Sequence, residues 1–72
     1  MKTQQEVNQI STMIRQARSA QHMTQQQLAE KCGIAKYRIS QVENDIGNVP
    51  VYILRTIVEK GLGGQFRIAF EF

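Results

Sequence analysis

The chain has 72 residues and a mass of 8.2 kDa, enough for one small domain and too few for two independent hydrophobic cores. Nine Lys and Arg against six Asp and Glu give a net charge of +3, a mild basic excess that suits an anionic partner. The single cysteine excludes an internal disulfide and favours a reducing, cytoplasmic compartment.

Groups that could support catalysis or membrane insertion are scarce. His22 and Cys32, the single histidine and the single cysteine, have no paired carboxylates nearby, which disfavours an enzyme. No apolar run approaches the roughly 20 residues that span a bilayer. We therefore expect no catalytic activity, no metal, no cofactor and no membrane partner.

The amino-terminal part of the chain predicts a helix from about residue 4 to about residue 20. Thr3 and Glu6 form a capping-box pattern at its start. Apolar residues then recur at helical spacing, at Val7, Ile10, Met13, Ile14 and Ala17. Met13 and Met23 are expected to fill gaps in the core.

Two short helices follow in close succession. A second capping-box pattern, Thr24 with Gln27, predicts a helix over residues 25–32 that Gly33 ends. After a turn of a few residues, residues 36–44 predict another helix, with Ile39 and Val42 facing the core.

A loop over residues 45–48 separates these helices from a fourth one. Pro50 stands where a helix can begin, because the first turn does not need its missing N–H group. The apolar positions that recur at helical spacing are Val51, Leu54, Ile57 and Val58. The glycines at 61, 63 and 64 are expected to end this helix.

The last residues change to a period of two, which predicts a half-buried strand. Its apolar positions, expected to mediate dimerisation, are Phe66, Ile68, Phe70 and Phe72. No second strand pattern exists in the sequence, so we expect this strand to pair with the same strand of another copy in a homodimer. The alternative is a frayed tail whose aromatic rings pack on the helices. We thus expect a helical domain over residues 1–62 and a dimerisation strand over residues 63–72.

One side of the helix predicted over residues 36–44 carries groups that can bond to nucleic acid. A helical projection gathers Tyr37, Ser40, Gln41 and Asn44 opposite the core side. A short polar helix fits the major groove of DNA, where a glutamine can pair with adenine. Lys36 and Arg38 flank this side within reach of phosphates. The alternative is an ordinary solvated face.

The residues from Thr24 to Asn44 resemble the phage-repressor or Xre-like helix-turn-helix family. The shared pattern is Thr24-Gln25, Leu28-Ala29, Gly33-Ile34, Ile39-Ser40 and Glu43 at the family's spacing. The resemblance covers roughly residues 10–60 and implies a mainly α fold, a repressor-like bundle of four to five helices followed by the carboxyl-terminal strand. In that family the second of the paired helices lies in the major groove.

The resemblance also assigns roles by position. It implies that Lys36, Tyr37 and Gln41 contact bases, with Ser40 close by, and that the phosphate-contacting positions are Gln25 and Asn44. Arg18 and Glu43 match a structural pair that joins the first helix to the end of the recognition helix. Two positions depart from the family pattern: Ala35 replaces the usual capping Ser or Thr, and Asp45 replaces a glycine.

We therefore expect a transcriptional repressor that binds an inverted repeat of double-stranded DNA as a homodimer. The end of the chain is similar to antitoxins of the HipB kind, in which a Xre-like domain precedes a strand shared between two subunits. This similarity implies an alternative function, an antitoxin whose main ligand is a toxin protein and which regulates its own operon.

Overall fold

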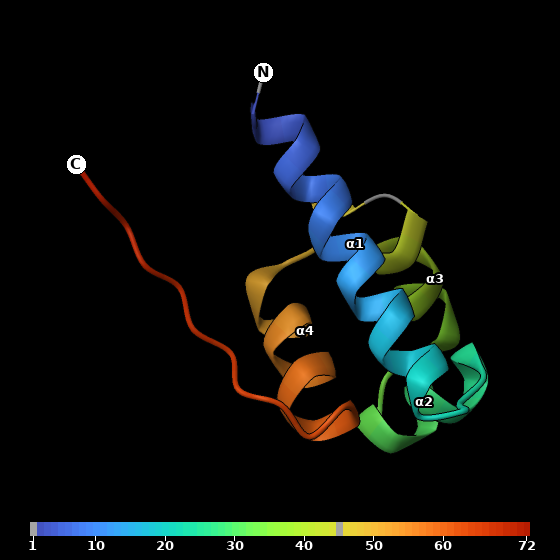
Figure 1. Ribbon diagram of the computed structural model, residues 1–72. Helices are drawn as coiled ribbons and strands as arrows, with labels where there is room; N and C mark the ends of the chain where they lie inside the picture. The colour runs from blue at the N-terminus through green and yellow to red at the C-terminus, as the bar shows by residue number, and fades with distance from the viewer. Residues whose placement is uncertain (1, 45) are drawn as a thin grey trace.

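The computed structural model contains four α-helices within the residues that it describes, which are 2–44 and 46–72, with only the backbone described at residues 2–8 and 46. The predicted loop residue Asp45 and the side chains of the predicted box at Thr3 and Glu6 lie outside this description. In chain order (Figure 1) the helices and helical turns are α1 (Lys2–Ala20), α2 (Gln25–Cys32), α3 (Lys36–Asn44), the 3₁₀ turn η1 (Ile46–Asn48), α4 (Val51–Thr56) and the π-helical turn η2 (Ile57–Gly61).

The predicted start and end of α2 are confirmed in atomic detail. The Thr24 hydroxyl accepts a hydrogen bond from the backbone N–H of Gln27 at 3.0 Å, and the Gln27 amide oxygen accepts one from the N–H of Thr24 at 2.8 Å. Gly33 ends the helix with a φ of 72°, a left-handed conformation that favours glycine. Local sequence signals therefore set both ends of α2.

The fourth helical segment begins one residue after Pro50 and ends, as predicted, at Gly61. Pro50 is the residue before the helix rather than its first residue, and its carbonyl accepts a hydrogen bond from Ile53 N–H at 3.0 Å. The α-helix gives way after Thr56 to the π-helical turn η2. Of the apolar positions that predicted this helix, Val51 is 53 % exposed in the first turn, whereas Ile53 is buried.

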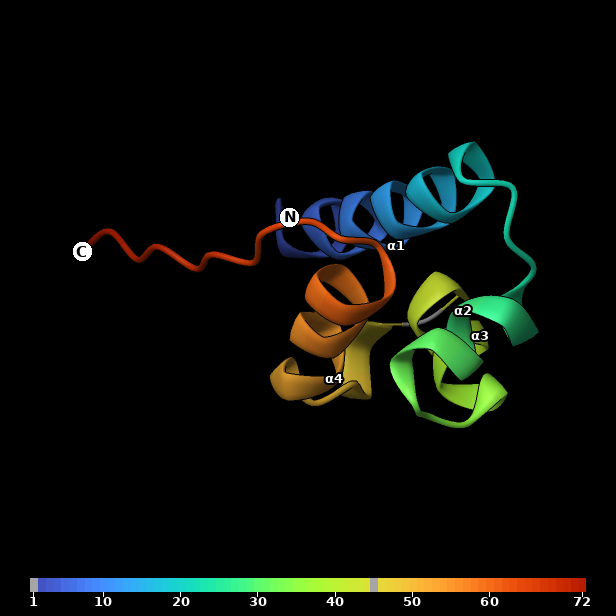
Figure 2. The same ribbon diagram turned by 90° about the horizontal axis from the view of Figure 1, so that it is seen from below.

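The hydrophobic core lies where α1, α2, α3 and η2 meet. Its fully buried side chains are Leu28, Ile39, Val42 and Ile57, which confirms the predicted inward face of α3. Figure 2 shows α1 lying across both α4 and the α2–α3 pair. The prediction that Met13 fills the core was wrong, because the side chain is 61 % exposed, whereas Met23 packs against the core as expected.

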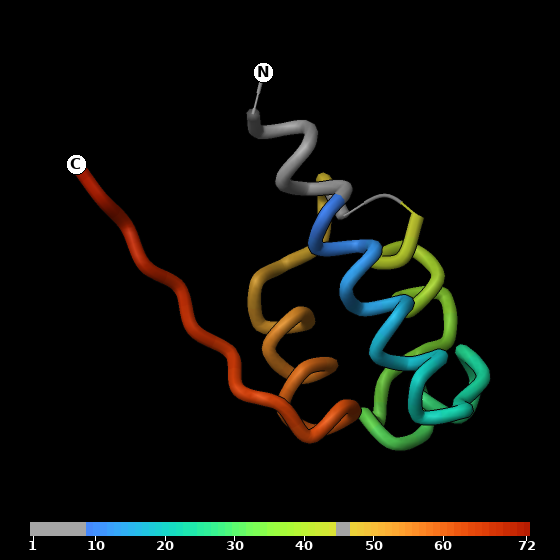
Figure 3. The backbone as a smooth tube through the Cα atoms, viewed as in Figure 1, coloured from blue at the N-terminus to red at the C-terminus, as the bar shows by residue number. Residues whose placement is uncertain are grey.

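The tail, defined as residues 65–72, leaves the helical body in an extended conformation (Figure 3). Within the described part of the chain no strand is formed, because a lone extended segment has no second segment to pair with. The predicted strand and its pairing across a homodimer therefore stay predictions. The aromatic rings at the end are solvated in the single chain, with Phe70 77 % and Phe72 fully exposed.

Candidate nucleic-acid interface

The turn between α2 and α3 fixes the angle between the two helices. The N–H of Gly33 bonds to the carbonyls of Ala29 and Glu30, and the N–H of Ile34 bonds to the Ala29 carbonyl at 3.1 Å. These bonds satisfy carbonyls at the end of α2, and the left-handed Gly33 reverses the chain at once. Helix α3 starts three residues later, so the two helices form a tight helix-turn-helix unit.

The two sides of α3 differ in exposure. Ile39 and Val42 are completely buried and hold the helix on the core. On the other side Lys36 is exposed, Tyr37 is 63 % exposed and Asn44 is exposed. The remaining predicted contact residues on this helix, Arg38, Ser40 and Gln41, are half-buried. The six polar positions singled out on α3 thus range from exposed to half-buried, on a helix that Ile39 and Val42 anchor to the core.

Several of these polar side chains contact one another before any ligand is present. The guanidinium carbon of Arg38 lies 5.4 Å from the centre of the Tyr37 ring, a distance typical of a cation–π contact. The Asn44 amide nitrogen donates to the Ser40 carbonyl at 2.8 Å and approaches the Ser40 hydroxyl at 3.3 Å. These contacts restrict the side chains at both ends of the exposed side.

Gln41 is the one residue of α3 with an unsatisfied buried atom among the described residues. Its amide oxygen is inaccessible to solvent and has no hydrogen-bond partner. An unpaired buried acceptor costs about 1–3 kcal/mol. A hydrogen-bond donor that reached this oxygen would remove that cost.

A buried carboxylate ties α3 to α1 and α2. Glu43, with a side chain only 2 % exposed, accepts from Arg18 Nε at 2.7 Å and from Arg18 Nη2 at 3.0 Å. The side chain of Gln25 donates to the same carboxylate at 3.1 Å, and Arg18 Nη1 donates to the carbonyl of Met23 at 2.7 Å. The hydrogen bonds to Glu43 raise the pKa of Arg18, although its own burial acts in the opposite direction.

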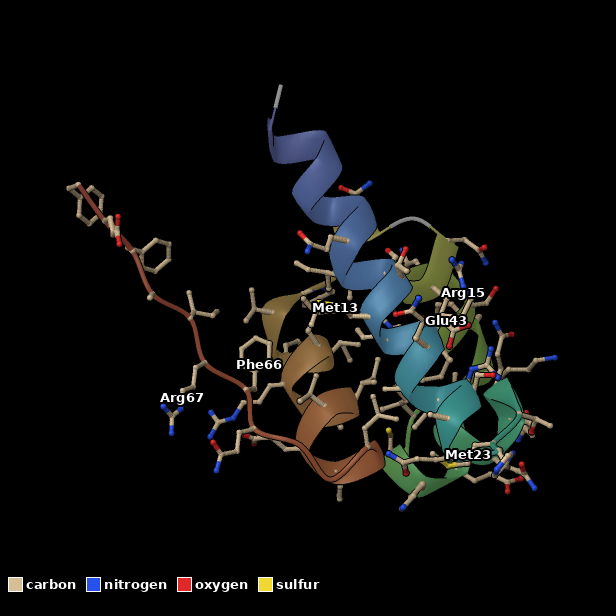
Figure 4. All side chains as sticks on the ribbon, viewed as in Figure 1. Met13, Arg15, Met23, Glu43, Phe66 and Arg67 are labelled. Atoms are coloured by element: carbon tan, nitrogen blue, oxygen red, sulfur yellow. The ribbon has the colours of Figure 1, made fainter. Side chains whose placement is uncertain are left out.

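Two further contacts between α1 and α3 were absent from the sequence analysis. The buried Ser11 hydroxyl donates to the Val42 carbonyl at 2.7 Å, and Arg15 Nη1 donates to the Glu43 carbonyl at 3.3 Å. Figure 4 shows Arg15 beside Glu43 between the two helices. No sequence signal could have identified these bonds, because their acceptors are backbone carbonyls brought near by the crossing of α1 over α3.

The remaining chemical groups singled out in the sequence lie away from α3. Burial raises the pKa of the Cys32 thiol, an effect that Lys60 and Lys31 partly offset, so the neutral thiol is favoured in the core. His22 occupies the turn after α1 with a φ of 58°. Over residues 2–44 and 46–72, no cluster of three His, Cys, Asp or Glu residues could hold a metal ion, and no described helix is long and apolar enough to cross a membrane.

Comparison with protein families gives one match. The helix-turn-helix model HTH_3, which represents the Xre and phage-repressor type, matches residues 14–60, more than half of the chain. The chain belongs to this helix-turn-helix family. Neither the comparison with curated proteins nor the comparison with solved structures found a match.

As a member of this family, the chain is a DNA-binding regulator, and α2 and α3 are the two helices of its helix-turn-helix unit. In helix-turn-helix proteins the second helix of the unit lies in the major groove, and the first crosses the sugar-phosphate backbone. In this helix-turn-helix regulator the second helix is α3, with its anchored apolar side and its accessible polar side. The match begins at Ile14 and ends at Lys60, so it includes the Arg18–Glu43 pair and excludes the tail.

Proposed function

We propose that the protein is a sequence-specific transcriptional repressor that binds an inverted repeat as a homodimer and represses transcription by occupying it. The observation that carries this proposal is the geometry of α3, which buries Ile39 and Val42 and leaves a polar side accessible within a helix-turn-helix unit. A helix of this size enters the major groove, which is about 12 Å wide.

Base recognition is assigned to four residues of α3, namely Lys36, Tyr37, Ser40 and Gln41. The Gln41 amide can donate to and accept from adenine at once, and its partnerless oxygen favours such an exchange. Tyr37, largely exposed, can bond to a base edge through its hydroxyl. Lys36 begins the helix, where side chains of recognition helices approach the bases most closely.

Phosphate binding is assigned to Gln25, Arg38 and Asn44. Gln25 is the first residue of α2, and the N–H groups at a helix start attract anions. Its side chain is held by Glu43, so a phosphate bound there would be connected directly to the recognition helix. Arg38 and Asn44 lie near opposite ends of α3, where the walls of the groove carry phosphates.

The dimer is assigned to the tail, through Phe66, Ile68, Phe70 and Phe72. Two of these rings, Phe70 and Phe72, already stack on one another with centroids 6.3 Å apart and an angle of 22° between their planes. Both rings lie on the same side of the extended tail and are highly exposed, which supports a role in packing against a second chain. The antitoxin alternative stays a prediction, and binding of DNA that weakens steeply with salt would favour the repressor over it.

The test uses DNA selected from a random pool by the full chain, followed by affinity measurements on the selected and a scrambled duplex. Gln41→Ala is expected to cost about 1–3 kcal/mol on the selected site and little on scrambled DNA, since it removes a base contact. Gln25→Ala is expected to weaken binding to both duplexes alike, since phosphates carry no sequence.

Gln16→Ala is the matched control, because Gln16 is exposed on α1 and lies outside the proposed contacts. It should leave both affinities unchanged. Urea unfolding of each variant separates binding from folding, which matters for Gln25 because its side chain also contacts Glu43. Equal losses for Gln41→Ala on the two duplexes would refute the assignment of base recognition.

A further inference from the structure

An apolar groove between α1 and α4 remains open in the single chain. It has a volume of about 270 Å³ and includes the exposed side chain of Met13. Its main apolar lining comes from Met13, Ile10 and Ala17 on α1, Leu54 on α4, Val58 on η2, and Phe66 at the start of the tail. We call this the α1–α4 groove. Its lining is almost entirely apolar, so a further apolar side chain would be compatible with it.

The base of the tail is fixed against the groove by hydrogen bonds. Gln21, the first residue after α1, donates from its side chain to the Leu62 carbonyl at 3.0 Å, and the N–H of Gly64 bonds to the Val58 carbonyl at 2.8 Å. Phe66 is consequently half-buried in the groove (Figure 4). The residues beyond it leave the body with rising exposure, from 53 % at Ile68 to 77 % at Phe70.

Symmetry restricts how two such tails can pair. A two-fold axis that relates antiparallel strands must stand perpendicular to their sheet, so each residue lies on the same face in both copies. Residues directly opposite one another also share a face. Hence the even-numbered apolar residues of both tails lie together on one face, while Arg67, Ala69 and Glu71 of both tails lie on the other.

Charge then selects one register from those that symmetry allows. If Ala69 lies opposite the partner's Ala69, Arg67 lies opposite Glu71 of the partner subunit, and the same pair forms again across the axis. Registers centred on Arg67 or on Glu71 would instead place like charges directly opposite each other, which is destabilising. A register centred on Ile68 or Phe70 would leave these two charges without a direct cross-strand partner.

We propose that two tails pair antiparallel about Ala69 and that the apolar face of this ribbon closes the α1–α4 groove of each copy. Phe66 lies opposite the partner's Phe72 in this register. The ring of the partner's Phe72 therefore packs beside Phe66 and Met13 in the groove. Two strands alone are marginally stable in water, and the groove supplies the packing they need. The occupant is thus a second copy of this chain. This inference rests on the proposed homodimer and adds its register and its docking site.

A charge-reversal cycle tests the register with the full chain, by sedimentation equilibrium or by dilution monitored with light scattering. Glu71→Arg and Arg67→Glu each place like charges opposite one another twice, so each should weaken dimerisation about fivefold to thirtyfold. The double variant Arg67→Glu/Glu71→Arg exchanges the partners and should restore the dimer. Lys60→Glu, an equal charge change at an exposed position outside the tail, should leave dimerisation nearly unchanged.

Disulfide trapping tests the same register by geometry. Ala69→Cys would bring two thiols directly opposite each other, with Cα atoms about 4.5–5.5 Å apart, a separation that a disulfide can bridge. Arg67→Cys would place its two thiols four residues apart along the ribbon, about 13 Å, which is too far. Mild oxidation should therefore link the first variant into a covalent dimer and leave the second largely unlinked. The natural Cys32 is buried and should not compete.

The groove is tested by coupling between two variants. Met13→Gln and Phe72→Ala should each weaken the dimer, and together they should weaken it less than the product of their separate effects, because they remove one shared contact. Tyr52→Ala, at a side chain that is 65 % exposed outside the groove, is the control and should show no coupling to Phe72→Ala.

The outcomes separate this inference from the proposed function. A wild-type chain that stays monomeric at micromolar concentration overturns both the dimer and its register. A dimer in which the single reversals have no effect, or in which the double variant is no better than either single one, overturns the register alone. Independent effects of Met13→Gln and Phe72→Ala overturn the groove as docking site. Failure to bind DNA with the charge cycle intact refutes only the proposed function.

Discussion

At the residue scale, the buried carboxylate of Glu43 connects α3 to both α1 and α2. It is almost fully buried, and it accepts two bonds from Arg18 and one from Gln25. A charge removed from water is tolerated only when such partners compensate for its lost hydration. The group therefore makes the orientation of α3 depend on residues in α1 and at the start of α2, and any loss of one partner is felt at the proposed recognition surface.

Replacing Arg18 by methionine should destabilise the protein by about 3–5 kcal/mol, because Glu43 would stay buried without its opposite charge. Urea denaturation measures the loss. The double variant Arg18→Met/Glu43→Leu removes the buried charge as well and should recover most of the stability. If the double variant were as unstable as Arg18→Met alone, packing by the Arg18 side chain, rather than the ion pair, would account for the effect.

At the scale of elements, the close approach of η2 to α2 depends on Gly61. A methyl group added there would overlap Cys32 Sγ and would lie 2.6 Å from Leu28 Cδ1, both in the core. Gly61 has no positive φ, so its small size, and not its backbone freedom, is what the packing needs. The π-helical turn thus brings the end of α4 onto the first helix of the helix-turn-helix unit.

Gly61→Ala should therefore lower the free energy of unfolding by about 1–3 kcal/mol, with the higher helix propensity of alanine offsetting part of the steric cost. Thermal or urea unfolding measures the change. Lys60→Ala, at the exposed neighbour, is the matched control and should stay within about 0.5 kcal/mol of wild type. A Gly61→Ala variant as stable as its control would show that η2 can shift away from α2 at no cost.

The sequence predicted those elements whose signals are local. The box at Thr24 and Gln27, the left-handed Gly33 and the inward pair Ile39 and Val42 were each readable within a few residues. Contacts between residues far apart in the sequence were not predicted, because the periodicity of a helix does not indicate what packs against its apolar face. Met13 has helical spacing yet faces an open groove.

The same limit applies within the proposed DNA-binding surface. The family pattern pointed to Gln25 as a phosphate contact, but its bond to Glu43 depends on how α2 meets α3. The Ser11 and Arg15 bonds to α3 depend in the same way on how α1 crosses it. The sequence was enough to select the candidate DNA-contacting residues. Their contacts with one another could be known only from the arrangement of the helices.

At the scale of the whole molecule, one chain offers a single recognition helix and a tail that pairs with no strand in the described part of the chain. A single half-site holds few contacts, and two linked half-sites raise affinity through their effective concentration, in the millimolar range for short connections. The proposed dimer would place its two α3 helices on one face of the duplex only if the half-sites are about 34 Å apart, one turn of DNA. In the proposed dimer, pairing of the tails and spacing of the half-sites would thus be parts of the same mechanism.

Deleting residues 65–72 should give a monomer at micromolar concentration, measured by sizing with light scattering, and should lower operator affinity by about 100-fold or more. Inserting five base pairs between the half-sites turns one of them to the opposite face of the duplex. The insertion should reduce wild-type affinity to the level of the deletion variant, yet leave the deletion variant itself unaffected, because a monomer binds each half-site alone. Equal sensitivity of both proteins to the insertion would mean that contacts between the helical bodies, and not the tails, hold the two recognition helices in register.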